Sequence, residues 1–177
     1  MIRITTTLSM IIQTSNTIQL RHLSQEDAPF LLDLYNQPAF IQHIGDRGIH
    51  SLEDAKAFIN TTQEHYKKVG FWLYLVVDSQ SGIPVGVNGL LQRDYLAFPD
   101  IGFAISQKYW GKGYAYESAI AVLKHAAELK LPEVLAITSE GNKNSIGLLS
   151  KLGFTDEGKQ IIPNSNESVK LYRKVIG

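Results

Sequence analysis

The chain has 177 residues, of which 44% are hydrophobic, and equal numbers of basic and acidic side chains, 17 of each. This length fits one domain, and the hydrophobic content suffices for a sizeable core, which excludes an intrinsically disordered chain. The balanced charge gives no general attraction to nucleic acid or to an anionic membrane, so we expect neither as a partner. Cysteine is absent. This excludes disulfides, thiolate metal sites and an acyl-cysteine intermediate, and it is compatible with a cytoplasmic location.

The start of the chain predicts a leader rather than a membrane segment. Residues 1–16 are rich in Ser and Thr, and their apolar patch, residues 8–12, is too short to span a bilayer. A basic start and a small-residue cleavage site are both missing, which argues against a signal peptide. We expect residues 1–13 to be a dispensable leader, with its first nine residues preceding a more typical start at Met10, and residues 14–177 to form a single domain. The five histidines show no metal-ligand spacing, so we expect no metal.

The first part of the domain predicts one strand and two helices. Residues 17–23 alternate apolar and polar side chains, which is typical of a half-buried strand. Ser24 is expected to cap a helix that Pro38 ends, and Ser51 to cap a second helix. Residues 40–51, which join the two helices, are expected to form a loop.

Strands dominate the remainder of the chain. They are expected at residues 71–77, 84–91, 100–106, 133–139, 154–162 and 168–175. Helices are expected at residues 114–130 and 142–152, and the last two strands are expected to pair antiparallel. This order predicts an α+β fold, a sheet with helices on its faces.

Residues 109–117 read Tyr-Trp-Gly-Lys-Gly-Tyr-Ala-Tyr-Glu and join a predicted strand to a predicted helix. Glycine permits positive φ and close approach of a ligand, and the first N–H groups of a helix attract phosphate oxygens. The stretch therefore predicts a cradle for an anion, most simply a pyrophosphate. The spacing matches neither Gly-x-Gly-x-x-Gly nor a P-loop, and the glycines alone leave open a tight turn that binds nothing.

Two motifs resemble those of the GNAT superfamily of N-acetyltransferases, in particular its RimJ/RimL-type branch. The first is the stretch at residues 109–117, preceded by Asp-Ile-Gly-Phe at residues 100–103. It resembles the acetyl-CoA-binding motif, although Trp110 stands where Gln or Arg is usual. The second is Asn-x-x-Ser at residues 142–145, on a helix that ends in Lys-Leu-Gly-Phe at residues 151–154.

This resemblance implies a mixed, mostly antiparallel sheet of six to seven strands with helices on both faces. It also implies that the fourth and fifth strands splay apart to admit the pantetheine arm of acetyl-CoA. The residues that it implies for cofactor binding are Phe103, Ala104, Ile105, Trp110, Gly111, Lys112, Gly113, Tyr114, Ala115, Tyr116, Asn142 and Ser145. A plain helix N-cap is the alternative role for Asn142.

The activity implied is acetyl-CoA-dependent transfer of acetyl to a primary amine by direct attack in a ternary complex. Asp100 is the expected general base, with a solvated carboxylate at a strand start as the alternative. Glu167, which the resemblance places in the last loop, is a second candidate. Ser145 is the expected donor to the departing thiolate.

The acceptor is expected to bind against the first two helices and the loop that joins them. The residues expected to contact it are Tyr35, Phe40, His43 and Arg47. The alternative role for these four residues is packing of the loop. The resemblance favours a protein N-terminus as the acceptor, as in ribosomal-protein acetyltransferases. A small amine or an antibiotic, and a non-catalytic acyl-CoA-binding module, remain as alternatives. The protein is expected to be a monomer or a homodimer.

Overall fold

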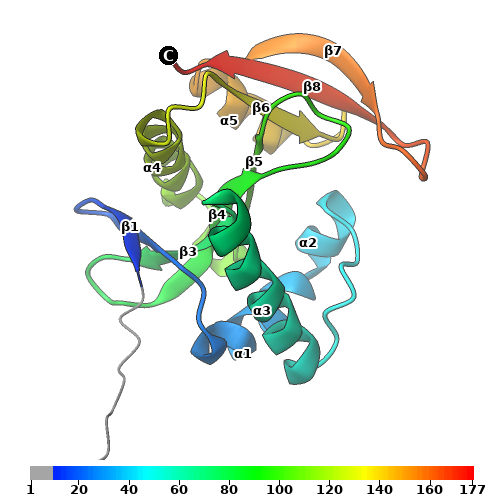
Figure 1. Ribbon diagram of the computed structural model, residues 1–177. Helices are drawn as coiled ribbons and strands as arrows, with labels where there is room; N and C mark the ends of the chain where they lie inside the picture. The colour runs from blue at the N-terminus through cyan, green and yellow to red at the C-terminus, as the bar shows by residue number, and fades with distance from the viewer. Residues whose placement is uncertain (1–9) are drawn as a thin grey trace, which may run out of the picture.

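A computed structural model describes residues 10–177. These residues form an eight-stranded sheet with the order β1-β2-β3-β4-β5-β6-β8-β7 (Figure 1). The strands are β1 Ile11–Thr14, β2 Ile18–Arg21, β3 Leu73–Asp78, β4 Pro84–Leu91, β5 Asp100–Ile105, β6 Glu133–Thr138, β7 Thr155–Ile161 and β8 Ser168–Val175. The α-helices are α1 Ala28–Tyr35, α2 Pro38–His43, α3 Leu52–Val69, α4 Tyr114–Glu128 and α5 Lys143–Lys151. The predicted α+β class is confirmed.

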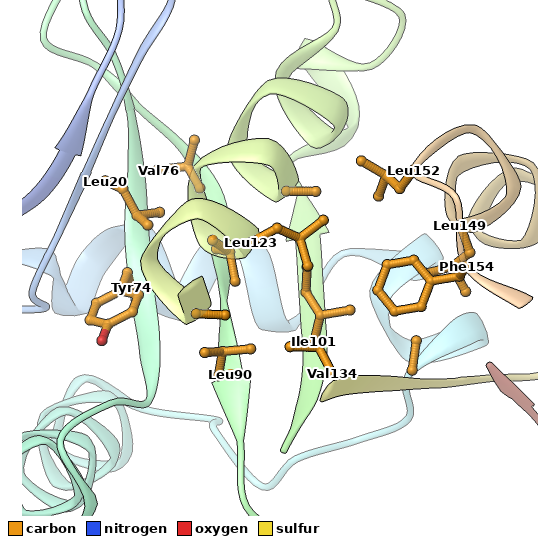
Figure 2. Packing of buried hydrophobic residues seen from close by; sticks show 14 of the residues in the cluster. Leu20, Tyr74, Val76, Leu90, Ile101, Leu123, Val134, Leu149, Leu152 and Phe154 are labelled. Carbon is orange, nitrogen blue, oxygen red and sulfur yellow. The ribbon is translucent and has the colours of Figure 1, made fainter. Parts of the chain in front are cut away.

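Helices cover both faces of the sheet, as expected, because the central strands are apolar on both sides. Successive residues of β3 point to opposite faces, so Tyr74 and Val76 pack in one core cluster and Leu75 and Val77 in another. The first cluster lies under α4 and α5, and Figure 2 shows Leu123 of α4 among its members. The second lies under α1, α2 and α3.

The helix boundaries follow the expected capping chemistry. At α3, the side chain of Ser51 accepts a hydrogen bond from the Asp54 N–H (3.1 Å), and Gly70 ends the helix with φ of 88°. At α1, the Ser24 cap opens a short 3-10 turn, Gln25–Asp27, before the α-helix begins. Both predicted N-caps are therefore confirmed.

Two local predictions are wrong. Residues 40–43 are helical, because Pro38 begins α2 rather than only ending the preceding helix; proline suits a first turn, where its missing N–H costs nothing. Residues 11–13, assigned to the leader, belong to β1, which pairs antiparallel with β2. The Gln13 side chain also donates to Glu128 of α4 (2.8 Å). With β1, the sheet has eight strands rather than the expected six to seven.

The pairing of β5 with β6 differs from every other pairing in this sheet. It is the parallel one, and its register contains a single pair, Asp100 with Leu135. The neighbouring β4–β5 ladder, in contrast, runs without interruption along all of β5. The expected splay of the fourth and fifth predicted strands, which are β5 and β6, is confirmed.

Within residues 10–177, no helix has the length and apolar character needed to cross a membrane. The same part of the chain holds no group of His, Cys, Asp or Glu side chains arranged to bind a metal ion.

The pairing of β1 leads to a prediction about the start of the domain. A chain that begins at Ser15 lacks β1. Its free energy of unfolding is expected to be about 2 kcal/mol lower than that of the full chain, which lowers Tm by roughly 4–8 °C. A chain that begins at Met10 is expected to keep the Tm of the full chain. Calorimetry on the three chains compares them. An unchanged Tm for the Ser15 chain would show that β1 adds no stability, and a large drop for the Met10 chain would show that residues 1–9 do.

Candidate active site

The backbone of β5 presents hydrogen-bond donors on the side where β6 diverges. The Ser106 N–H donates to the Val85 carbonyl (2.8 Å), which fixes the register of the β4–β5 ladder. Donors alternate sides along an antiparallel strand, so the Ala104 N–H also faces β4, whereas those of Phe103 and Ile105 face away from it. Because β6 pairs with β5 only at Asp100, these last two donors are free to bind a ligand. Of the three expected backbone donors, Ala104 is therefore engaged by the sheet.

The predicted cradle has the backbone geometry of an anion site. Gly111 and Gly113 have φ of 75° and 84°, a region that favours glycine, and a Cβ added to either would meet nothing within 4 Å. Gly113 caps α4, and its carbonyl accepts the first intrahelical hydrogen bond, from Glu117 (2.9 Å). The N–H groups of residues 114–116 therefore lack intrahelical partners and face the space before the helix. These features fit a pyrophosphate, because the helix dipole adds positive potential there.

Two side chains fix the cradle to the sheet. The indole Nε1 of Trp110 donates to the Ile105 carbonyl (2.8 Å), although the side chain is 46% exposed. The Tyr114 hydroxyl donates to Oδ2 of Asp78, the last residue of β3 (2.6 Å). This hydrogen bond, together with those from Ser81, lowers the pKa of Asp78 to about 2. Trp110 and Tyr114 thus hold the turn through the polar groups of their side chains, and their backbone groups remain for a ligand.

Further cations and aromatic rings surround the cradle. The ammonium groups of Lys108 and Lys112 lie 5.1 and 5.7 Å from the centroid of the Tyr109 ring. On the other side of α4, Lys151 of α5 lies 4.2 Å from the Tyr116 ring. This contact joins the helix that follows β5 to the helix that follows β6, and it engages the face of the Tyr116 ring.

Asn142 and Ser145 lie at the start of α5, directly after β6. The Asn142 side-chain oxygen accepts a hydrogen bond from the Ser145 N–H (3.1 Å), which is the N-cap role left open by the sequence. Both residues are half-buried. The cap uses one group of each residue, and the Asn142 amide nitrogen and the Ser145 hydroxyl are not part of it.

Asp100 lies where β5 and β6 meet. Its side chain is 1% exposed, and Arg93 Nε donates to its Oδ1 (3.0 Å). Burial raises the pKa of Asp100 to about 6, an effect that the positive charge of Arg93 opposes. The alternative of a solvated carboxylate is thereby excluded. A carboxylate of this pKa is mostly ionised at neutral pH and can accept a proton.

The second candidate base lies in a different environment. Glu167 is exposed in the turn between β7 and β8, where its N–H donates to the Ser165 hydroxyl (3.2 Å). Figure 1 shows this hairpin turn projecting from the body of the sheet.

The expected acceptor residues divide into two groups. Tyr35 and Phe40 are buried with their ring centroids 4.3 Å apart, and burial raises the pKa of the Tyr35 hydroxyl. For these two, the structure supports the packing alternative. His43 and Arg47 are exposed, at the end of α2 and just after it. The structure therefore does not bring all four to one surface.

Sequence reasoning missed two residues near this site. Arg93 is one, and Gln37 at the start of α2 is the other. Gln37 donates to the Ser106 hydroxyl (3.0 Å) and accepts from the Gln107 N–H (3.0 Å). These bonds tie the α1–α2 junction to the end of β5. They join residues about seventy positions apart, which no local pattern reveals.

Comparison with known proteins agrees with this geometry. A family model described as the Acetyltransferase (GNAT) domain matches residues 17–155. The uncharacterised protein YkkB of Bacillus subtilis (strain 168) is 26% identical over 164 residues, which cover 90% of this chain and 93% of YkkB. The chain belongs to the GNAT family and is an acyltransferase.

Solved structures share the fold. A GNAT-family acetyltransferase from Bacillus anthracis superposes with a TM-score of 0.77 at 26% identity, covering 94% of this chain and 98% of that one. RimL, described as a ribosomal L7/L12 alpha-N-protein acetyltransferase, was solved in complex with coenzyme A. It superposes with a TM-score of 0.82 at 20% identity, covering 94% of this chain and 98% of RimL. At that identity the likeness to RimL shows the fold alone.

The cradle geometry predicts the effect of a side chain at Gly113. Gly113→Val places a β-branched residue at φ of 84°, which costs about 1–2 kcal/mol and displaces the backbone donors of α4. We expect the folded variant to lose measurable affinity for coenzyme A in titration calorimetry. Gly70→Val is the matched control, because Gly70 has φ of 88° at the far end of α3 and should show the same strain with unchanged affinity. Wild-type affinity in Gly113→Val would contradict the assignment.

Proposed function

We propose that this protein is an acetyl-CoA-dependent N-acetyltransferase that acetylates the α-amine of a protein or peptide N-terminus, by direct attack in a ternary complex. The observation that supports this most strongly is the combination of free backbone donors on β5 with a glycine cradle at the end of the same strand. The GNAT family match supports the same reaction class. Bound acetyl-CoA would supply an acetyl group activated as a thioester.

The protein groups have separate tasks in this reaction. The N–H groups of residues 114–116 hold the pyrophosphate, and Lys112 adds positive charge beside them. The N–H groups of Phe103 and Ile105 stabilise the negative charge that develops on the carbonyl oxygen. The Ser145 hydroxyl donates to the sulfur as the C–S bond breaks. Positioning by these groups lowers the entropic part of the barrier.

Asp100 takes the proton of the amine. A protonated nitrogen has no lone pair, so this proton must leave before or while the C–N bond forms. Along β5, Ala104 packs in the cluster under α1–α3, and Asp100 shares that face because residues four apart in a strand point the same way. The carboxylate thus lies on the face that α2 also covers.

The acceptor proposal rests on that same face. Beside His43 and Arg47, the side chains of Ile41 and Ile44 are exposed on α2 and just after it. Exposed apolar groups next to cationic and polar ones suit a peptide better than a highly charged small molecule. The name of RimL, which acts on a protein α-amine, supports the same acceptor class.

An acceptor screen tests this proposal. Thiol release from acetyl-CoA is measured with N-terminal peptides, polyamines and aminoglycosides. The proposal predicts release with peptides that have a free α-amine and none with the same peptides after N-terminal acetylation. Release with polyamines or aminoglycosides alone would favour the small-amine alternative, and coenzyme A binding without release from any amine would favour a binding module.

The role of Asp100 leads to a prediction about rate. Asp100→Asn keeps the side-chain shape and removes the base, so kcat should fall by about 10²–10⁴-fold with little change in affinity for acetyl-CoA. The loss should shrink as pH rises, because more amine is then already deprotonated. Steady-state rates across pH check this, with Glu167→Gln as the comparison. Wild-type turnover in Asp100→Asn with loss in Glu167→Gln would transfer the role to Glu167.

A further inference from the structure

A half-buried charged group accompanies the proposed base. Arg93 lies in the loop between β4 and β5, with its side chain 27% exposed, and its Nε bonds Asp100 Oδ1. The hydrogen bond is made by Nε, the guanidinium nitrogen nearest the aliphatic part of the side chain. Tyr95, from the same loop, lies beside the guanidinium and adds to the causes that raise the pKa of Arg93.

We propose that Arg93 is a positioning residue for acetyl transfer, which orients the Asp100 carboxylate and keeps it negatively charged where β5 and β6 meet. This inference rests on the proposed function and adds a residue to it. Arg93 acts through Asp100, and it need not touch either substrate.

Electrostatics give the reason why Asp100 needs such a partner. A carboxylate buried without an opposite charge becomes neutral, and a neutral carboxyl group cannot accept the amine proton. Arg93 is the charged group that acts on Asp100. The two strands beside β5 supply no charge at this position. The residues paired with Asp100 are Leu91 of β4 and Leu135 of β6, and both are uncharged.

Beyond Leu135, the charged groups of β6, β7 and β8 form ion pairs with one another. Arg173 of β8, opposite Leu135 in the register, bonds Glu133 through Nη1 (2.7 Å) and lies 3.5 Å from Glu157 through Nε. Removing Arg93 would therefore leave the Asp100 carboxylate without a counter-charge from β4, β6 or β8.

Another Arg–Asp ion pair in this protein has a purely structural role and serves as a comparison. Arg21 bonds both oxygens of Asp27 (2.9 Å each), and Asp27 also accepts the Ser24 N–H (2.8 Å) at the start of the first helix. Both oxygens of Asp27 are thus occupied. The Asp100 carboxylate, in contrast, accepts one hydrogen bond from Arg93, at Oδ1, and its own backbone N–H is the other donor that acts on it.

A pocket next to Arg93 suggests a further test by chemical rescue. The pocket has a volume of about 380 Å³ and is lined by Arg93, Gln92 and Asp94 together with apolar groups that include Phe71, Phe98 and Leu131. Because Arg93 both lines this pocket and bonds Asp100, its truncation is expected to open space between the two. A small guanidinium ion could then replace the missing group, which allows chemical rescue.

The first test is the pH dependence of kcat/KM for Arg93→Gln. In the wild type the rate should rise with pH through about 6, as Asp100 loses its proton. In Arg93→Gln this rise should move up by about 1–3 pH units, so that the rate at pH 7 falls about 2- to 100-fold and recovers at high pH. Arg21→Gln is the matched control and should lower Tm without moving the rise. An unmoved rise in folded Arg93→Gln, together with an unchanged pKa of Asp100, would overturn the proposal.

The second test needs no acceptor. The pKa of Asp100 is measured from its carboxyl ¹³C chemical shift in the wild type and in Arg93→Gln, and it should be higher in the variant. Equal values would refute the role of Arg93, whatever the activity is. A raised value with no change in the rate profile would show instead that Asp100 is not the base, which separates failure of the proposed function from failure of this inference.

The third test is rescue. Millimolar methylguanidinium should restore turnover of Arg93→Ala at pH 7 and leave the wild type unchanged. Arg93→Lys keeps the charge and should retain more activity than Arg93→Gln. Equal activity of Arg93→Lys and Arg93→Gln, without rescue of Arg93→Ala, would reduce Arg93 to a packing role.

Discussion

The site depends on the point where backbone pairing between β5 and β6 stops. A parallel pair of strands normally continues because every unpaired N–H and C=O in a sheet interior costs free energy. Here the register holds one pair, Asp100 with Leu135, and the strands then diverge. The donors of Phe103 and Ile105 consequently lack the partner that a regular sheet would provide. A thioester and its arm are suited to replace that partner.

The other groups of the candidate site lie near the two ends of β5. At its C-terminal end, two left-handed glycines turn the chain into α4, whose free N–H groups create positive potential. At its N-terminal end, five residues and about 16 Å away, a buried carboxylate keeps its charge beside Arg93. In the proposed reaction, one strand thus separates the groups that would hold a phosphate from the carboxylate that would take the proton. The continuous β4–β5 ladder keeps this spacing rigid.

Local chemistry determined what could be predicted from the sequence. The caps at Ser51 and Gly70 and the turn at Gly113 depend on neighbouring residues, and the structure confirms them. The residues that could not be predicted depend on contacts far along the chain. Gln37 meets Ser106 only after folding, and burial of Tyr35 depends on how α1 packs against α2 and α3. Pro38 is ambiguous in sequence, because proline both ends one helix and begins the next.

Hydrogen exchange of single β5 amides tests the central claim most directly. The account predicts that the amides of Phe103 and Ile105 exchange rapidly in the free protein and are strongly protected by acetyl-CoA. The Ala104 amide, bonded towards β4, should be protected in both states. Unchanged exchange of Phe103 and Ile105 in protein saturated with acetyl-CoA would show that the ligand does not lie between β5 and β6, and would contradict the account.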